Sequence, residues 1–177
     1  MATRKGYGQV EPNHLSAQHN GQVYAQLPAT NIAQLENGQF LKYDYAAGAA
    51  DTTGDIEWML VYNEEKLYDE RYQNHKDFAM KATDMTDGVI YPRLFKTHVG
   101  DIFTTNTFRN TNDATVAGPD ATITIPDLAV NNYVEIDSDG WLVKATSKPT
   151  APDIAFKVVK VYTMPDGQFG VKLQRVQ

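Results

Sequence analysis

The sequence predicts a mainly β protein: a single antiparallel β-barrel or β-sandwich body with one short helix and an extended N-terminal arm. Short runs of alternating apolar and polar residues recur between turn residues through most of the 177-residue chain, as in antiparallel barrels and sandwiches. Only one stretch has sustained helical spacing. Residues 1–29 are polar and carry few large apolar side chains, so they are predicted to be separate from the body at 30–177.

The predicted arm, residues 1–29, has too few apolar side chains to order itself. Fixing about 30 residues costs roughly 30–60 kcal/mol of backbone entropy, whereas burying six large apolar side chains returns only about 9–18 kcal/mol. We therefore expect an arm that is mobile in isolation or laid along the sheet edge of another chain. A plainly disordered terminus is the alternative. The expected anchor residues are Tyr7, Val10, Leu15, Val23, Tyr24 and Leu27.

The first predicted strands of the body are residues 31–36 and 39–45, on either side of Asn37-Gly38. Asn-Gly supplies the two positive φ angles of a type I′ turn, so a tight hairpin is predicted here. Residues 55–62 form the most apolar run of the chain. Apolar residues occur in both of its alternating sets, which is typical of a central strand.

One helix is predicted, from Asn63 to about Ala82. Asn63 is a favourable N-cap, and Glu64 and Glu65 suit the positive end of the helix dipole. Aromatic and apolar residues recur at helical spacing along a thin stripe. We therefore expect this helix to lie on the surface of the body.

Strands are predicted again in the second half of the chain, at 89–96, 102–108 and 121–125. Because Pro92 lacks an N–H group, the first of these is expected at a sheet edge or with a bulge. Two further hairpins are predicted from their turn residues. They join 133–136 to 141–145 and 154–163 to 169–176.

Composition and motifs argue against several classes of function. The chain has no cysteine, which excludes disulfides, thiolate zinc sites and cysteine nucleophiles. Its net charge of −6 argues against nucleic acid as a specific partner. No apolar run reaches the ~18 residues of a membrane-spanning helix, and no nucleophile elbow or glycine-rich phosphate loop is present. We expect no enzyme activity, no metal, no cofactor and no membrane partner.

Charge is unevenly distributed along the chain. Residues 51–87 carry ten acids and four bases, a net charge of −6, whereas residues 154–177 carry four bases and one acid, a net charge of +3. Solvated surface is the simple explanation. The alternative is that each charged region faces a partner of opposite sign.

Two local features leave alternatives open. Asp137-Ser138-Asp139-Gly140 is similar to the start of a calcium loop, but the third acidic position and the distal Glu are missing, so a turn is favoured. Trp141 follows this turn and, with Tyr133, is a candidate exposed aromatic contact that could stack on a sugar.

Four stretches of the sequence resemble small virion structural proteins of tailed bacteriophages. They are the Gln-rich start at 1–27 and the segments 57–68, 99–107 and 162–167. The resemblance implies a decoration, cement or auxiliary protein, without catalytic residues, that binds the major capsid protein and stabilises the head. It also implies a location on the capsid surface of the virion, after assembly in the host cytoplasm, and a homo-oligomer such as a trimer. The alternative function is a carbohydrate- or receptor-binding β module of a phage tail or head fibre.

Overall fold

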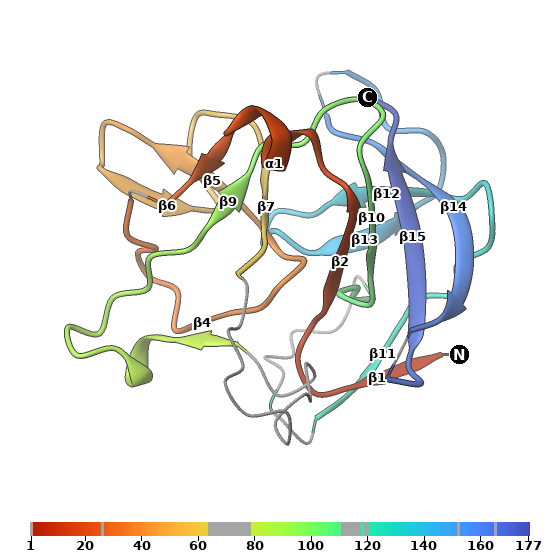
Figure 1. The fold of residues 1–177 in the computed structure, drawn as a ribbon, viewed down its shortest axis with the longest axis horizontal. Coiled ribbons are helices and arrows are strands. Elements are labelled where there is room, and N and C mark those ends of the chain that lie inside the picture. Colours follow the sequence, from red (N-terminus) through yellow and green to blue (C-terminus); the bar gives the residue numbers. More distant parts are fainter. Residues whose placement is uncertain are drawn as a thin grey trace.

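The computed structural model describes residues 2–25, 27–63, 79–110, 118, 121–151, 153–164 and 166–177. Within these residues the fold is mainly β with one α-helix, which confirms the predicted fold class. The described strands form separate antiparallel sheets and do not close into a barrel, so a sandwich-like body is the form that fits (Figure 1).

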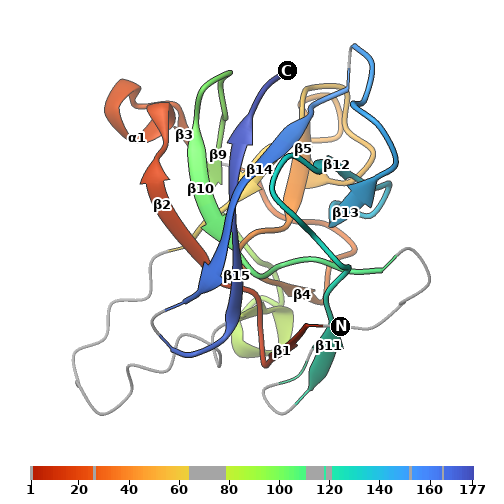
Figure 2. The same ribbon diagram turned by 90° about the vertical axis from the view of Figure 1, so that its right-hand side faces the viewer.

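Six strands form the largest sheet in the described part of the chain. In spatial order they are β13 (Leu142–Ala145), β12 (Tyr133–Ile136), β14 (Phe156–Thr163), β15 (Phe169–Arg175), β10 (Ile102–Thr105) and β2 (Val10–His14). Figure 2 shows β2, β10, β15 and β14 side by side. The two hairpins predicted in the last third of the sequence are confirmed, because β12 pairs with β13 and β14 pairs with β15 across their turns.

Five shorter strands form the second large sheet. In order they are β3 (Val23–Tyr24), β9 (Leu94–Phe95), β7 (Met59–Val61), β5 (Phe40–Asp44) and β6 (Ala49–Asp51). The predicted central strand at 55–62 is confirmed over Met59–Val61, since β7 lies in the middle of the sheet and all three of its residues are buried. Residues 55–58 are not part of a strand. Pro92 precedes β9 and does not interrupt it. Because β9 pairs with β3 on one side and β7 on the other, the expected edge position for this strand is wrong.

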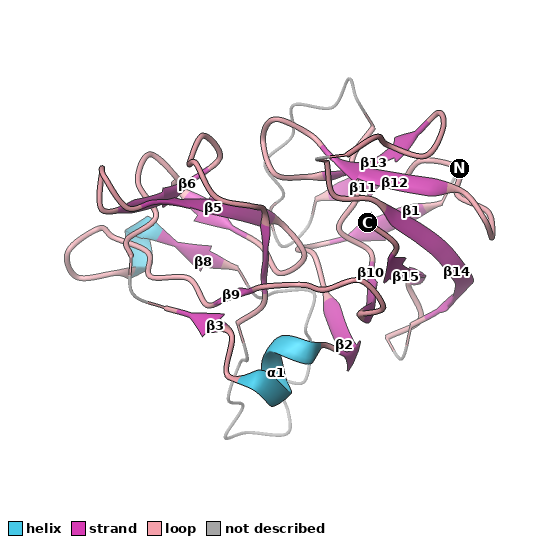
Figure 3. Cartoon of the chain, turned by 90° about the horizontal axis from the view of Figure 1, so that it is seen from above, coloured by secondary structure: helices cyan, strands magenta, loops and turns pink. Residues whose placement is uncertain are grey.

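The five-stranded sheet lies between two hydrophobic cores. Phe40, on one of its faces, packs with Phe103 and Phe156 of the six-stranded sheet, and the three ring centroids are 5.5 to 6.4 Å apart. Leu41 and Met59 point to the opposite face and belong to the second core. Because both faces are covered, the strands of this sheet are apolar almost continuously. Figure 3 shows the two large sheets on opposite sides of the molecule.

Two small sheets and one helix complete the described fold. The small sheets pair β1 (Thr3–Lys5) with β11 (Thr122–Thr124), and β4 (Gln34–Leu35) with β8 (Met80–Lys81). The helix α1 (Ser16–Asn20) connects β2 to β3, and a 3-10 turn (Ala82–Asp84) follows β8. Neither α1 nor its position was predicted, because five residues are too few to establish a helical period.

The predicted hairpin at Asn37-Gly38 is wrong. Strand β4 pairs with β8, and β5 pairs with β6 and β7, so β4 and β5 are not partners. Gly38 has φ of 92°, but Asn37 is not at positive φ, as a type I′ turn would require. The Asn37 side chain instead donates to the Asn63 carbonyl and accepts from the Asn63 N–H at 2.8 Å. Asn37 therefore connects this turn to the end of β7.

The predicted helix from Asn63 to Ala82 falls mostly outside the described residues, since 64–78 are not among them. Its last turn is wrong, because Met80–Lys81 is strand β8. The Asn63 side chain accepts from the Arg93 N–H at 2.9 Å. This contact holds β7 against the segment that leads into β9.

The largest correction concerns the predicted arm. Residues 2–25, which we call the N-terminal segment, contribute β1, β2 and β3 to three different sheets of their own chain. Each of these strands is at an edge of its sheet. The backbone hydrogen bonds that a lone arm would lack are therefore supplied within the chain. The predicted boundary at 29/30 is also wrong, because Ala29 forms bridges to Ala50 and Ile90 inside the body.

Candidate functional site

The predicted anchor residues pack into the protein's own body. Tyr7 is 1% exposed and Leu15 is 0% exposed. The remaining four are half-buried: Val10 and Val23 pack against the first core, and Tyr24 and Leu27 pack against the second. All six side chains therefore contact the body of their own chain. The expectation that Tyr7 and Leu15 project toward another protein is corrected, because both are buried.

A buried ion pair fixes the N-terminal segment and was not predicted. The Arg4 guanidinium is 0% exposed, and its Nη2 lies 2.8 Å from Oε2 of Glu36. The same Oε2 accepts from the Gly8 N–H at 2.7 Å. Burial lowers the pKa of Arg4, and the Glu36 carboxylate opposes this effect. One face of the guanidinium is 5.6 Å from the centroid of Trp141. No local pattern in the sequence links residues so far apart.

The predicted aromatic pair, Tyr133 and Trp141, is not brought together. Tyr133 pairs with Ala145 at one end of the β12–β13 hairpin, and Trp141 follows the turn at the other end. Four residues along a strand separate the two positions by about 13 Å. Since Arg4 also covers one ring face of Trp141, these two residues do not form a joint stacking platform.

The Asp137–Gly140 segment is a turn, as the sequence favoured. One oxygen of Asp137 accepts from the N–H groups of Asp139 and Trp141, both at 2.9 Å. Arg109 contacts the other oxygen of Asp137 at 2.7 Å and Asp139 at 2.6 Å. A guanidinium therefore supplies the positive charge that a calcium ion would provide in the alternative reading.

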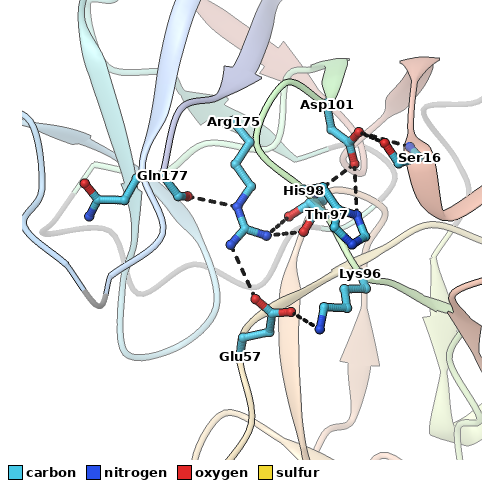
Figure 4. A network of polar contacts seen from close by, with 8 residues as sticks. All are labelled: Ser16, Glu57, Lys96, Thr97, His98, Asp101, Arg175 and Gln177. Atoms are coloured by element: carbon cyan, nitrogen blue, oxygen red, sulfur yellow. Dashed lines mark hydrogen bonds and ion pairs between the residues drawn. The ribbon is translucent and has the colours of Figure 1, made fainter.

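Ser16, Asp101 and His98 come together but lack the geometry of a catalytic triad (Figure 4). In such a triad the serine hydroxyl bonds to the histidine. Here the hydroxyl and the backbone N–H of Ser16 both donate to Oδ1 of Asp101. The backbone N–H of His98 donates to Oδ2 at 2.9 Å. The buried Asp101 carboxylate therefore holds the first turn of α1 against the loop before β10.

A cluster of three charged side chains, Glu57, Lys96 and Arg175, is also drawn in Figure 4 and connects the two large sheets. Glu57 contacts Nζ of Lys96 at 2.8 Å and Arg175 at 3.3 Å. Arg175 lies at the end of β15 and also donates to the Thr97 carbonyl. Burial alone would raise the pKa of Glu57, but the two cations lower it overall. The hydrogen bond to Glu57 raises the pKa of Lys96.

An aromatic cleft of about 440 Å³ adjoins this charged group. Its lining combines apolar, aromatic and charged side chains: Tyr24, Tyr45, Ile56, Glu57, Met59 and Lys96. Met59 is buried, whereas Tyr45, directly after β5, is 63% exposed. The cleft was not predicted, because its residues come from four segments separated by up to 72 positions in the sequence.

The outer face of the six-stranded sheet carries two lysines directly opposite each other. Lys160 on β14 pairs in register with Lys172 on β15, and both ammonium groups lie over the Tyr162 ring, at 5.6 and 5.9 Å from its centroid. The Tyr162 hydroxyl donates to Glu11 at 2.6 Å. Within the described residues neither lysine has an ion pair. We call Lys160, Tyr162 and Lys172 the lysine face.

No protein-family model, curated protein or solved structure matches this chain. In the part of the chain that the structure describes, no helix has the length and apolar content needed to cross a bilayer. Among the same residues, no three His, Asp or Glu side chains gather where they could hold a metal ion.

Proposed function

We propose that the chain is a non-catalytic structural protein of a tailed-phage virion, which binds the major capsid protein and stabilises the head as a decoration or cement protein. The observation that carries the proposal is the lysine face. Like charges directly opposite each other on neighbouring strands destabilise a sheet. An acidic protein that places two lysines in this way gains from a partner that supplies negative charge.

The resemblance noted in the sequence supports the identity of that partner. The segment 162–167, one of the stretches that resemble phage virion proteins, begins with Tyr162 of the lysine face. The buried anchor residues make the arm unsuitable as a docking element. We therefore place the docking surface on the folded body, at the outer face of β14 and β15.

Non-covalent binding is enough to reinforce the shell, and no chemical reaction is needed. A folded body that contacts neighbouring capsomers adds interface area, and an interface of standard size, about 1,600 Å², is sufficient for tight binding. Many copies on one shell multiply the effect. In this proposal the protein resides on the capsid surface of the virion, with a homo-oligomer such as a trimer as the docking unit.

The test is co-sedimentation of the purified protein with shells assembled from the major capsid protein. The variant combines Lys160→Glu with Lys172→Glu, and the matched control combines Lys144→Glu with Lys148→Glu, two exposed lysines outside the lysine face. Both variants change the net charge by −4. We expect the first variant to lose binding and the control to retain it. Circular dichroism verifies that both are folded.

Salt dependence is the second part of the test. Docking between a basic face and an acidic surface weakens as salt screens the charges. Equal binding by the two variants would contradict docking through the lysine face, and a wild-type protein that never sediments with shells would contradict capsid binding itself.

A further inference from the structure

We infer that the aromatic cleft is a carbohydrate-binding site that takes a hexose unit of a glycan. The inference goes beyond capsid binding and depends on a different part of the molecule. The cleft volume of about 440 Å³ is within the ~300–1,000 Å³ usual for small-ligand sites.

Tyrosine rings supply the apolar part of the site. Tyr24 and Tyr45 line the cleft, and the buried Tyr43 lies between them with edge contacts to both, at centroid distances of 5.7 Å. Tyr43 therefore supports both rings from behind and limits their movement. Rigid aromatic rings that combine apolar area with a hydroxyl are well suited to ligands with one apolar and one polar aspect. The C–H face of a pyranose ring is such a surface.

Glu57 and Lys96 line one side of the cleft and supply fixed hydrogen-bond acceptors and donors. Oε1 of Glu57 is buried and contacts Lys96, whereas Oε2 contacts Arg175. A carboxylate oxygen has about two acceptor positions, so Oε2 can still accept from a ligand hydroxyl. The Lys96 ammonium lies beside this carboxylate and has further N–H donors for a ligand. Neighbouring hydroxyls of a sugar match this adjacent acceptor and donor. A free carboxylate would favour a cation, but here two positive charges balance Glu57.

The cleft and the lysine face belong to different sheets. The cleft residues come from the five-stranded sheet and its loops, whereas the lysine face is on β14 and β15 of the six-stranded sheet. Figure 3 shows these sheets on opposite sides of the molecule. A protein docked through the lysine face would leave the cleft free to contact a polysaccharide.

The experiment uses the full chain on an array of neutral and acidic hexose and N-acetylhexosamine oligosaccharides, followed by calorimetric titration with the strongest binder. Tyr45→Ala is the main variant, because the exposed ring can be removed without disturbing a core. Tyr91→Ala is the matched control, since Tyr91 is 49% exposed and is not part of the cleft lining. We expect Tyr45→Ala and Glu57→Gln each to weaken binding about tenfold or more, and Tyr91→Ala to leave it unchanged.

Three results would overturn the inference. The first is a wild-type protein that binds no oligosaccharide on the array. The second is binding that Tyr45→Ala and Tyr91→Ala weaken equally. The third is a loss of shell co-sedimentation in Tyr45→Ala, which would assign the cleft to a protein partner. Shell binding by the lysine variants is measured separately, so failure of the glycan site and failure of capsid docking are distinguishable.

Discussion

The N-terminal segment and the C-terminal hairpin, residues 156–175, both contribute to the six-stranded sheet, yet only the hairpin was predictable. In the hairpin, β14 and β15 pair across a short turn, and local alternation with Gly167 in the turn is enough to indicate it. The N-terminal segment pairs Thr3 with Thr124, Val10 with Thr105 and Val23 with Phe95. Its partners are more than 70 positions away, and no local pattern identifies them.

The contrast shows why apolar content was a poor guide to order. Six large apolar side chains do not offset the backbone entropy of a lone arm that has no hydrogen-bond partners. The structure supplies those partners at the edges of β11, β10 and β9. It also supplies a buried ion pair between Arg4 and Glu36. A polar segment can therefore be an integral part of a fold when its own chain offers open sheet edges.

The largest expected effect comes from deleting residues 1–25. The deletion removes Tyr7 and Leu15 from the interior and exposes three strand edges. We expect a loss of at least about 5 kcal/mol in the free energy of unfolding, enough to unfold a typical domain. Circular dichroism and urea unfolding measure it. A truncated protein that unfolds cooperatively at the wild-type urea midpoint would support the prediction of an arm that is independent of the body.

Breaking the buried ion pair is the next largest effect. Arg4→Met leaves the Glu36 charge buried without its partner, and we expect the free energy of unfolding to fall by about 3–5 kcal/mol. The double variant with Glu36→Gln removes that charge, so it should be more stable than Arg4→Met alone. Urea unfolding of both variants measures the difference. A loss below 1 kcal/mol in Arg4→Met would show that the N-terminal segment is not held by this pair.

Two glycines compare the regions directly. Gly21 ends α1 at φ of 69°, and Gly167 is in the turn of the C-terminal hairpin at φ of 84°, both with open space where a side chain would point. Alanine at either position should cost about 1 kcal/mol in the free energy of unfolding, because it strains the backbone without a clash. Thermal unfolding measures both variants. A negligible cost for Gly21→Ala alone would indicate that the N-terminal segment is less ordered than the hairpin.

The smallest expected effect is the pH dependence of Glu57. Its pKa in the folded protein is below the ordinary value of 4.5, so its contacts with Lys96 and Arg175 stabilise the fold above that pH and are lost as the pH falls through the folded pKa. Glu57→Gln should lower the free energy of unfolding by about 0.5–1 kcal/mol at pH 7. The difference from wild type should shrink as the pH falls below 4.5. Urea unfolding across this range measures it, and a difference that is constant with pH would exclude the ionic contribution.

Sequence patterns were sufficient for elements whose information is local. The alternation at 133–136 and 141–145 gave β12 and β13, and the continuous apolar run gave the buried β7. They failed at Asn37-Gly38, where a side-chain contact with the distant Asn63 replaces the hairpin turn. Turn chemistry describes local backbone preference, and tertiary contacts overrode it here.

The candidate sites depend on pairings that the sequence does not display. The net charge of residues 154–177 indicated a basic region, but only the register of β14 and β15 places Lys160 opposite Lys172. The cleft needs Tyr24 beside Tyr45, which requires β3 at the edge of the sheet that contains β5. Because β3 belongs to the segment predicted to be an arm, no sequence pattern groups these two rings.

Amide hydrogen exchange on the monomeric, shell-free protein tests the central claim most directly. The Gly8 N–H donates to buried Glu36, and the Gln9 N–H donates to Asn106 at 2.8 Å. If the N-terminal segment is an integral part of the fold, these amides should exchange as slowly as the Val171 and Leu173 amides of β15, within about tenfold. Exchange at the rate of an unstructured peptide at Gly8 and Gln9, beside a protected β15, would contradict the claim.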